Sequence, residues 1–428
     1  MRARNILILI TLLLATTGCQ KQAKTKPDYN RPLPPGASAL RQILDPAKWP
    51  DLHEPFEQKD GELVGALERS QSWFAAPSSR QFFPLGDVSH IRAQASVYAF
   101  RQLLAQSGSA SEFDAAMKEH FDCYTSIGFD DRGTVLFTGY FTPIFKGSTT
   151  RSAAYSYPLY KKPADLDIDP ISGKVYGRKL AGGGGHQPYP SRQELESSGE
   201  LNGLELVYLP TRMDQYIIQV NGSAKIELDN GGVMYVGYAG NNGHDYTGLG
   251  ATLVKEGVIE PEKLNLAAIR AHFADKPQDL ERYINMNDRY VFFAEYSGGN
   301  WPAGSLGVRV TERRTLATDK DIFPRGGVVL VQTRSAAGRG REARTDFNQW
   351  MADQDTGGAI RAAGRGDIYM GIGPQAETLA GGQFAEGRLY YFFLKHALVM
   401  DWARRMMEDP SGVRPAPAPS AAPVAASY

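Results

Sequence analysis

The chain has 428 residues, long enough for two or three domains that each bury a core of their own. Its 47 Lys and Arg balance 47 Asp and Glu, so the net charge is zero and nothing in the overall charge attracts nucleic acid. Two cysteines and seven scattered histidines disfavour zinc chemistry. The chain has no phosphate-binding Gly-Lys-Ser/Thr loop and no Gly-x-Ser-x-Gly elbow, which disfavours phosphoryl transfer and serine hydrolysis. We expect no metal and no cofactor.

The amino terminus has the layout of a secretory signal. Arg2 and Arg4 precede an apolar run from Ile6 to Ala15, which is shorter than the roughly 20 residues that a membrane-spanning helix needs. Cys19 follows Gly18 in the manner of a lipoprotein processing site, where the thiol is acylated and becomes the first mature residue. We therefore expect a signal peptide over 1–18 and a tether over 19–45, with a plain cleaved signal as the alternative.

Helical periodicity dominates the next part of the chain. The pattern predicts helices between about residues 60 and 107, ending before Gly108, and a further helix that Ser111 caps. Cys123 is interpreted as a small buried hydrophobic residue, since Cys19 leaves it no disulfide partner. Residues 135–142 then alternate as a strand that Pro143 closes.

Short apolar segments separated by turn signals follow, and they indicate a β-rich domain. Strands are predicted at 206–209, at 216–220 before Asn221-Gly222, and at 232–238, with helices near 264–273 and 277–285. After Asn287 we expect strands at 290–295, 308–310, 327–333 and 366–371, then a helix over 389–404. The Pro/Ala/Ser-rich end after Asp409 predicts disorder.

Two aspartates close to glycines, Asp355 and Asp367, form the candidate catalytic stretch. If 366–371 is a strand, Asp367 and Tyr369 share one face, while Ile368 and Met370 face the core. An acid beside an aromatic ring suits a groove that cleaves sugars. The alternative, that both aspartates are ordinary turn residues, stays open from the residues alone.

Four sequence blocks carry a family resemblance: Gly139–Pro143, Gln219–Ser223, Tyr238–Tyr246, and Gln354–Ile360 with Asp367–Gly371. In this order, behind a lipoprotein signal, they resemble the membrane-bound lytic murein transglycosylase A family, whose members cleave peptidoglycan. The resemblance implies a mainly β fold with flanking helices. A double-psi β-barrel would be assembled from two chain segments, 46–144 and 284–405, that lie on either side of an inserted β domain (145–283) in the sequence. The glycan would lie in the groove between the two domains, and residues 406–428 would form a disordered tail.

The resemblance also implies the chemistry. Asp367 is expected to be the single catalytic acid and base, with Asp355 and Asp319 in support, although Asp321 beside Asp319 competes for that role. The enzyme would be an exotransglycosylase that cuts the β-1,4 bond between N-acetylmuramic acid and N-acetylglucosamine without water, forming 1,6-anhydro ends. An intramolecular hydroxyl nucleophile makes a second carboxylate dispensable, and Asp367 must then have a raised pKa.

Aromatic rings and amide or hydroxyl groups are expected to bind the sugars. The candidates are Tyr140, Thr142, Gln219, Asn221, Gly222, Ser223, Tyr238, Asn242, Tyr246 and Tyr369. Core packing is the alternative for each tyrosine, a hairpin turn for Asn221-Gly222, and a strand end for Thr142.

Two rival functions are an inverting peptidoglycan hydrolase with two carboxylates and a non-catalytic peptidoglycan-binding lipoprotein. The expected partners are glycan strands and the periplasmic face of the outer membrane, which the chain would contact through lipidated Cys19. We expect a monomer.

Overall fold

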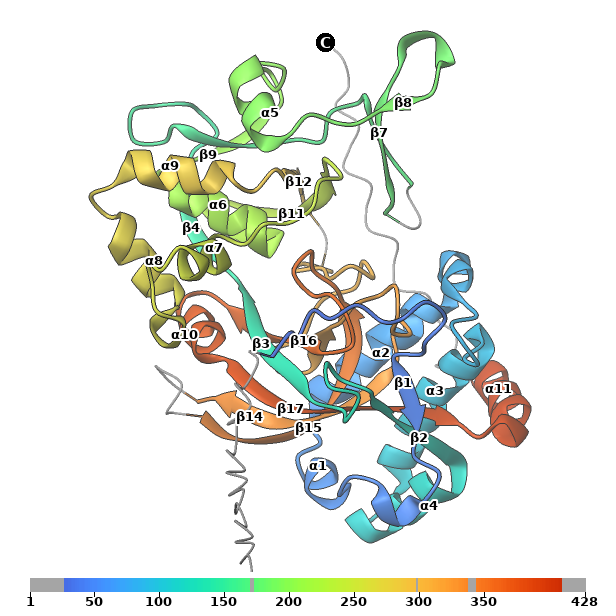
Figure 1. Ribbon diagram of the computed structural model, residues 1–428. Coiled ribbons are helices and arrows are strands. Elements are labelled where there is room, and N and C mark those ends of the chain that lie inside the picture. The colour runs from blue at the N-terminus through green and yellow to red at the C-terminus, as the bar shows by residue number, and fades with distance from the viewer. Residues whose placement is uncertain (1–26, 170–172, 298, 338–343, 410–428) are drawn as a thin grey trace, which may run out of the picture.

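A closed barrel of six strands forms the lower half of the molecule (Figure 1). The strands neighbour one another in the order β17-β14-β15-β13-β16-β3, and β3 pairs back with β17 to close the barrel. The pairs β13–β15 and β16–β3 are parallel, and the others are antiparallel. The barrel strands are β3 (Val135–Thr142), β13 (Thr315–Ala317), β14 (Val328–Ala336), β15 (Arg344–Asp355), β16 (Arg365–Ile372) and β17 (Phe384–Leu394). The predicted barrel with an inserted domain is confirmed, since β3 precedes the insertion and the other five strands follow it.

The computed structural model describes residues 27–169, 173–297, 299–337 and 344–409. The predicted signal peptide, Cys19 and the tail from residue 410 lie outside the described residues. Residues 406–408, which the tail prediction included, belong to the last helix. Within the described ranges, every helix is too short or too polar to cross a bilayer.

Helices cover one side of the barrel, where β1 (Leu40–Gln42) and β2 (Phe121–Ser126) extend the sheet beyond β17 (Figure 1). These helices are α1 (His53–Glu57), α2 (Gly61–Ala75), α3 (His90–Gln106), α4 (Ala110–His120) and α11 (Val399–Glu408), with 3-10 turns at Pro46–Lys48, Pro77–Phe82 and His396–Leu398. Trp350 of β15 is fully buried and packs edge-on against Phe100 of α3, with ring centroids 4.7 Å apart. Cys123 is a buried free thiol, as predicted.

The inserted domain has a core of its own above the barrel (Figure 1). Its four-stranded sheet runs β12-β11-β10-β4, and isolated bridges from Ser148 to Tyr208 and from Lys161 to Phe293 connect it with the β5–β9 pair. Its strands are β4 (Ile144–Gly147), β5 (Tyr157–Tyr160), β6 (Leu166–Ile168), β7 (Val175–Lys179), β8 (His186–Gln187), β9 (Glu205–Leu209), β10 (Ser223–Leu228), β11 (Val233–Asn241) and β12 (Val291–Glu295). Its helices are α5 (Arg192–Ser198), α6 (Arg212–Asn221), α7 (Leu249–Lys255), α8 (Leu266–Phe273) and α9 (Pro277–Asn285), with 3-10 turns at Ala181–Gly183 and Pro261–Lys263.

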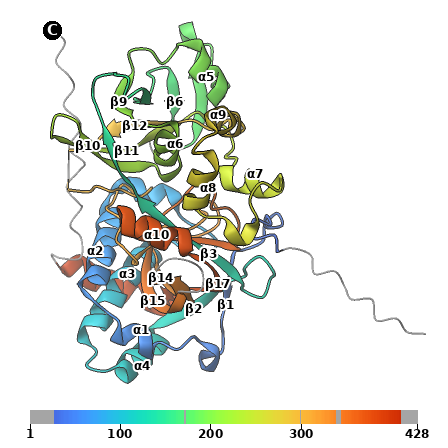
Figure 2. The same cartoon turned by 90° about the vertical axis from the view of Figure 1, so that its left-hand side faces the viewer.

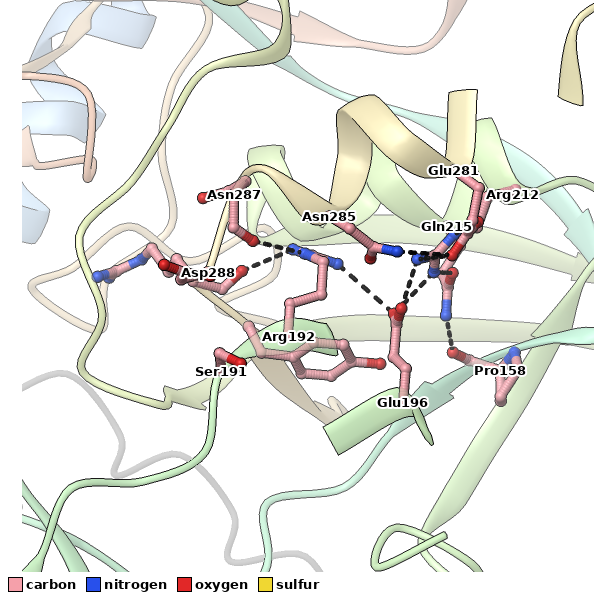
Figure 3. A network of polar contacts seen from close by, with 12 residues as sticks. Pro158, Ser191, Arg192, Glu196, Arg212, Gln215, Glu281, Asn285, Asn287 and Asp288 are labelled. Carbon is pink, nitrogen blue, oxygen red and sulfur yellow. Dashed lines mark hydrogen bonds and ion pairs between the residues drawn. The ribbon is translucent and has the colours of Figure 1, made fainter. Parts of the chain in front are cut away.

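A polar network joins three of these helices (Figure 3). Arg212 of α6 forms ion pairs with Glu196 of α5 at 2.5 Å and with Glu281 of α9 at 2.8 Å. Buried Arg192 donates its Nε to the carbonyl of Asn287 at 2.9 Å. Because removing one partner would leave a buried charge without compensation, the network fixes the helices relative to one another.

Helix α10 (Pro374–Gly382) lies between the two domains, against β3 and β16 (Figure 2). Gly139 of β3 makes this contact possible. A Cβ atom there would lie 2.9 Å from the Gln383 side chain and 3.0 Å from the Ala380 backbone. The glycine in the Gly139–Pro143 block is therefore explained by close packing.

The strand predicted at 216–220 is wrong, because these residues belong to helix α6. Thr211 caps the helix by accepting the backbone N–H of Asp214 at 3.1 Å, and Gly222 ends it with φ of 75°. Met213, Tyr216 and Ile217 are buried together at helical spacing. Asn221-Gly222 is thus a helix end and not a hairpin turn.

The helix predicted over 389–404 is also wrong in its first half, where β17 continues to Leu394 and α11 begins only at Val399. Residues 391–394 are buried on both faces of a central strand, and such a continuous apolar run does not distinguish a strand from a helix. The predicted strand at 308–310 is reduced to a single bridge between Ala303 and Arg309. Helix α4 starts two residues earlier than predicted, capped by Ser109.

Candidate active site

Asp367 lies in the middle of β16, between two other barrel strands. It stands opposite Ala317 of β13 on one side and Thr138 of β3 on the other. Ile368 and Met370 are fully buried in the main core, which confirms the predicted alternation along this strand. Asp367 itself is half-buried on the opposite face.

The surroundings of Asp367 favour its protonated form. Burial raises the pKa of its carboxyl group from 3.8 to about 7, and the positive charge of Arg365 opposes part of that rise. A hydrogen bond with the Thr138 side chain also lowers the pKa, and the nearby Asp355 carboxylate adds a smaller contribution in the same direction as burial. Among the described residues, Oδ1 of Asp367 is buried and has no hydrogen-bond partner. A carboxyl group with one buried, unbonded oxygen that is protonated near neutral pH can act as a general acid.

Asp355, the last residue of β15, has a different environment. Its Oδ2 accepts the Tyr140 hydroxyl at 2.7 Å, and its Oδ1 accepts the backbone N–H groups of Ser305 and Thr356, both at 2.8 Å. Burial raises its pKa, although these hydrogen bonds pull the other way. Both carboxylate oxygens are therefore engaged, and they tie the 304–305 turn and the Tyr140 ring to the end of β15.

Asp319 braces a loop. Its Oδ2 accepts the backbone N–H of Ala362 at 2.8 Å, and its Oδ1 accepts that of Asp321 at 3.2 Å. Ala362 has φ of 67°, a left-handed conformation that costs energy in a residue with a Cβ atom, so the loop before β16 needs such support. Asp321 points outward with its side chain 80% exposed, and of the two neighbouring acids only Asp319 has the supporting geometry.

A chain of hydroxyl groups leads from the barrel into the inserted domain. The Tyr369 hydroxyl is 2.9 Å from Oγ1 of Thr142, which is 3.4 Å from Oγ of Ser223 at the start of β10. The rings of Tyr140 and Tyr369 pack with centroids 5.1 Å apart. Four of the predicted substrate-binding residues are thus brought together beside Asp355, although Thr142 and Tyr369 are almost fully buried.

The predicted residues at the end of α6 differ in character. Gln219 is 5% exposed, and within the described ranges neither polar atom of its amide has a hydrogen-bond partner. Asn221 donates its Nδ2 to the carbonyl of Ile217 at 2.9 Å, as a helix-end residue does. A buried amide without partners has an unmet demand for hydrogen bonds, so Gln219 is the polar group here with capacity for a ligand.

The predicted residues Tyr238 and Asn242 of the 238–246 block differ in their surroundings. Tyr238 is exposed, and its hydroxyl accepts the Asn241 amide at 2.5 Å. Asn242 is buried, and its amide is used up by the carbonyls of Pro190 and Asp288 and by the N–H of Tyr290. Asn242 therefore braces the backbone, and both N–H groups of its amide are already used.

Tyr246 connects the two domains. The Cβ atom of Tyr246 lies 3.4 Å from the position that a Cβ atom on Gly358 would occupy. Tyr246 therefore packs on the loop that follows Asp355. The guanidinium of Arg289, from the segment after α9, lies 3.5 Å from the same point and donates to the carbonyl of His244 at 3.1 Å. The inserted domain thus contacts the loop that follows Asp355 directly.

Two features escaped the sequence reasoning. Thr138 accepts Nη2 of Arg365 at 3.3 Å beside Asp367, and its position two residues before Tyr140 could have indicated a shared strand face. Beneath the site, buried Lys320 forms an ion pair with buried Asp353, which also accepts the Tyr391 hydroxyl at 2.6 Å. In the described part of the chain, no group of three His, Cys, Asp or Glu side chains is placed to hold a metal ion.

Comparisons with known proteins agree with this architecture. The family model described as the MltA specific insert domain matches residues 136–294, and the 3D domain model matches residues 314–393. Membrane-bound lytic murein transglycosylase A of Escherichia coli K12 is 30% identical over 272 residues, which are 63% of this chain and 68% of that protein. The Vibrio cholerae protein of the same name is 28% identical over 272 residues, with the same coverage of both chains.

Solved structures share the fold. A membrane-bound lytic murein transglycosylase from Agrobacterium tumefaciens superposes with a TM-score of 0.67 at 20% identity, over 85% of this chain and 99% of that one. The Escherichia coli MltA structure with bound chitohexaose gives a TM-score of 0.62 at 23% identity, over 87% and 97% of the two chains.

Proposed function

The chain belongs to the membrane-bound lytic murein transglycosylase A family, and from this premise we propose that Asp367 alone carries the proton transfers of peptidoglycan cleavage. Membership makes the protein an enzyme that acts on peptidoglycan as a lytic transglycosylase. The residue roles, the bond that is cut and the cellular location are our proposals. The observation that carries them is the Asp367 carboxyl group, whose Oδ1 is buried without a hydrogen-bond partner among the described residues and whose pKa is raised to about 7.

The proposed reaction has two proton transfers. Protonated Asp367 donates its proton to the oxygen of the β-1,4 bond as the bond to C1 of N-acetylmuramic acid breaks, and the N-acetylglucosamine side leaves with a hydroxyl group. The C6 hydroxyl of the same muramic sugar then attacks C1, and the Asp367 carboxylate accepts its proton. The products are a 1,6-anhydro end and a regenerated acid, so no water is consumed.

The state of Asp355 favours this scheme over the two-carboxylate hydrolase. An inverting hydrolase needs a second carboxylate that is free to activate water. Both oxygens of Asp355 already accept hydrogen bonds, from Tyr140 on one side and from Ser305 and Thr356 on the other. We therefore assign Asp355 to positioning the Tyr140 ring and the 304–305 turn, and Asp319 to bracing the loop before β16.

Sugar contacts are proposed along the boundary between the domains. The chitohexaose bound in the Escherichia coli MltA structure supports a groove that binds a chain of sugars. Exposed Tyr238 offers a ring face, and Gln219 offers an unpaired amide for a hydroxyl or acetamido group. Tyr140, Thr142, Ser223, Tyr369 and Tyr246 shape the floor, while Asn221 and Gly222 form the helix end beside it.

Location and mode of action complete the proposal. Acylated Cys19 would hold the enzyme on the periplasmic face of the outer membrane. The enzyme would cleave glycan strands from their ends. The word "membrane-bound" in the names of the relatives supports the membrane part of this proposal. A plain secreted enzyme would instead release a soluble form without lipid, which mass spectrometry of the mature amino terminus would detect.

The test is to digest purified sacculi in water enriched in heavy oxygen and to analyse the fragments by mass spectrometry. We expect anhydro ends, one water lighter than reducing ends and free of label. The Asp367→Asn variant should give no fragments, whereas Asp321→Asn, with its side chain 80% exposed, serves as the matched control and should behave as the wild type. Labelled reducing ends would refute the proposal in favour of the hydrolase, and no cleavage by the wild type would favour a binding protein.

A further inference from the structure

A cavity of about 840 Å³ lies beside the barrel, between the start of α2, segment 302–314 and the end of β16. A second cavity, of about 310 Å³, shares Gly65, Arg69 and Arg309 with it, so the two lie side by side. The volume of the larger cavity falls within the range of about 300–1,000 Å³ that is usual for ligand pockets. The proposed mechanism uses none of the charged groups that line it.

The cavity begins close to the proposed acid. Tyr369 forms part of its wall, and Tyr369 follows Asp367 by two residues on the same face of β16. Two residues of strand span about 6.6 Å. The Tyr369 ring also packs on Tyr140, whose hydroxyl binds Asp355. A group attached to the sugar that is being cut can therefore extend into this cavity.

Two of the four arginines that line the cavity already have structural partners. Arg314 forms an ion pair with Asp60 at 2.8 Å. Arg313 lies over the Phe347 ring, 5.0 Å from its centroid, and donates to the carbonyl of Ala336 at 3.3 Å. These two arginines hold the walls together and leave little capacity for a ligand.

Arg69 and Arg309 are different. Arg69 donates Nη2 to the Thr311 hydroxyl, but its buried Nε has no hydrogen-bond partner among the described residues. Arg309 is exposed and makes no ion pair within the described ranges. Burial lowers the pKa of Arg69, and repulsion from the Arg309 guanidinium lowers it further, whereas the charges of Glu62 and Glu68 oppose part of this shift. Glu62 and Glu312 also line the cavity, yet neither forms an ion pair with Arg69 or Arg309.

We propose that Arg69 and Arg309 bind a carboxylate of the peptide stem that N-acetylmuramic acid carries, and so make the enzyme prefer strands that bear peptide. The inference rests on the proposed function, since it concerns the same substrate at the same site. Guanidinium groups recognise carboxylates through paired charge-assisted hydrogen bonds. The peptide stem supplies such carboxylates, whereas the sugar rings and their N-acetyl groups are uncharged.

The experiment compares two substrates of equal strand length: intact strands, and strands from which an amidase has removed the peptides. For Arg309→Gln we expect kcat/KM on intact strands to fall about tenfold, the effect of losing one hydrogen bond to a charged group. Activity on peptide-free strands should stay within about twofold. Arg309→Lys should recover part of the loss because it keeps the charge. Arg404→Gln is the matched control, since the Arg404 side chain on α11 is exposed, and it should change neither activity.

An equal fall on both substrates, or no fall on either, would overturn the inference. Calorimetry with the isolated muramyl peptide provides an arm that does not depend on catalysis. The wild type should bind the peptide, and Arg309→Gln should bind it about tenfold more weakly; equal binding by both proteins would refute the site. If neither substrate yields anhydro ends while the peptide still binds through Arg309, the proposed function fails and the carboxylate site stands.

Discussion

Replacing Asp367 with asparagine should stabilise the protein while it abolishes activity. The carboxyl group sits in a setting that resists ionisation, because in the described part of the chain its Oδ1 is buried without a hydrogen-bond partner and the charge of Arg365 offsets only part of the effect of burial. Above neutral pH the native state must hold the ionised form, which the unfolded chain can expose to water. An amide of nearly the same shape removes that cost.

The size and sign of this change in unfolding free energy follow from the pKa of Asp367 in the folded and in the unfolded chain. The pKa of the group is about 7 in the folded protein against 3.8 in the unfolded chain, a difference of about three pH units. At 1.36 kcal/mol per pH unit this corresponds to on the order of 4 kcal/mol. Between these two pKa values the folded state holds the proton and the unfolded state does not, so wild-type stability falls as pH rises from about 4 to 7. The advantage of Asp367→Asn should therefore grow over this range and stay constant above it.

Urea unfolding of both proteins at several pH values from 4 to 8 measures this difference, and the sacculus digest measures activity on the same samples. Asp346→Asn provides the control, since the side chain of Asp346 is 92% exposed and its amide should leave stability unchanged at every pH. A constant offset between Asp367→Asn and the wild type from pH 4 to 8 would show that the carboxyl group titrates normally. That result would remove the physical basis for its role as an acid.

Three further outcomes are expected. The kcat of the wild type should fall as pH rises through about 7, because the leaving oxygen needs the protonated form of Asp367, and a pH–rate profile that stays flat to pH 9 would contradict this. Tyr140→Phe removes the 2.7 Å hydrogen bond to Asp355 and should lower kcat by about tenfold with a smaller change in KM, as steady-state kinetics would show. Lys320→Met leaves the buried Asp353 carboxylate without its counter-charge and should cost about 3–5 kcal/mol in urea unfolding, and the double variant Lys320→Met/Asp353→Leu should recover part of that loss.

Strands with alternating apolar residues and helices with clear caps could be predicted from the sequence. The apolar segments 135–142, 232–238 and 366–371 predict β3, β11 and β16 to within a few residues, and α9 spans the predicted 277–285. Burial alternates along the first part of β11, whereas the start of β3 and residues 368–371 of β16 are buried on both faces. Short apolar runs bounded by turn signals are typical of strands in both situations.

Elements whose burial depends on distant segments were missed. The apolar run of helix α6 resembles a strand, since the helix is buried on more than one face between the sheet of the inserted domain, α9 and β3, and this burial obscures the helical period. The end of β17 is buried on both faces because α3 and the main core enclose it. Asn242 was expected to contact substrate, but carbonyls more than forty residues away in sequence occupy its amide. No local pattern encodes such long-range partners.

The resemblance could rank Asp367 above Asp355, but the physical reason for the ranking comes from their places in the barrel. Asp355 ends a strand, where the turn that follows and the neighbouring 304–305 turn present free N–H groups to its carboxylate. Asp367 stands in mid-strand between β13 and β3, where the backbone N–H groups are committed to the sheet and none bonds its carboxyl oxygens. A carboxylate without amide donors ionises reluctantly. The barrel thus gives Asp355 the hydrogen-bond donors of a brace and leaves Asp367 with the raised pKa that our proposal requires of the acid, although both aspartates lie close to glycine in the sequence.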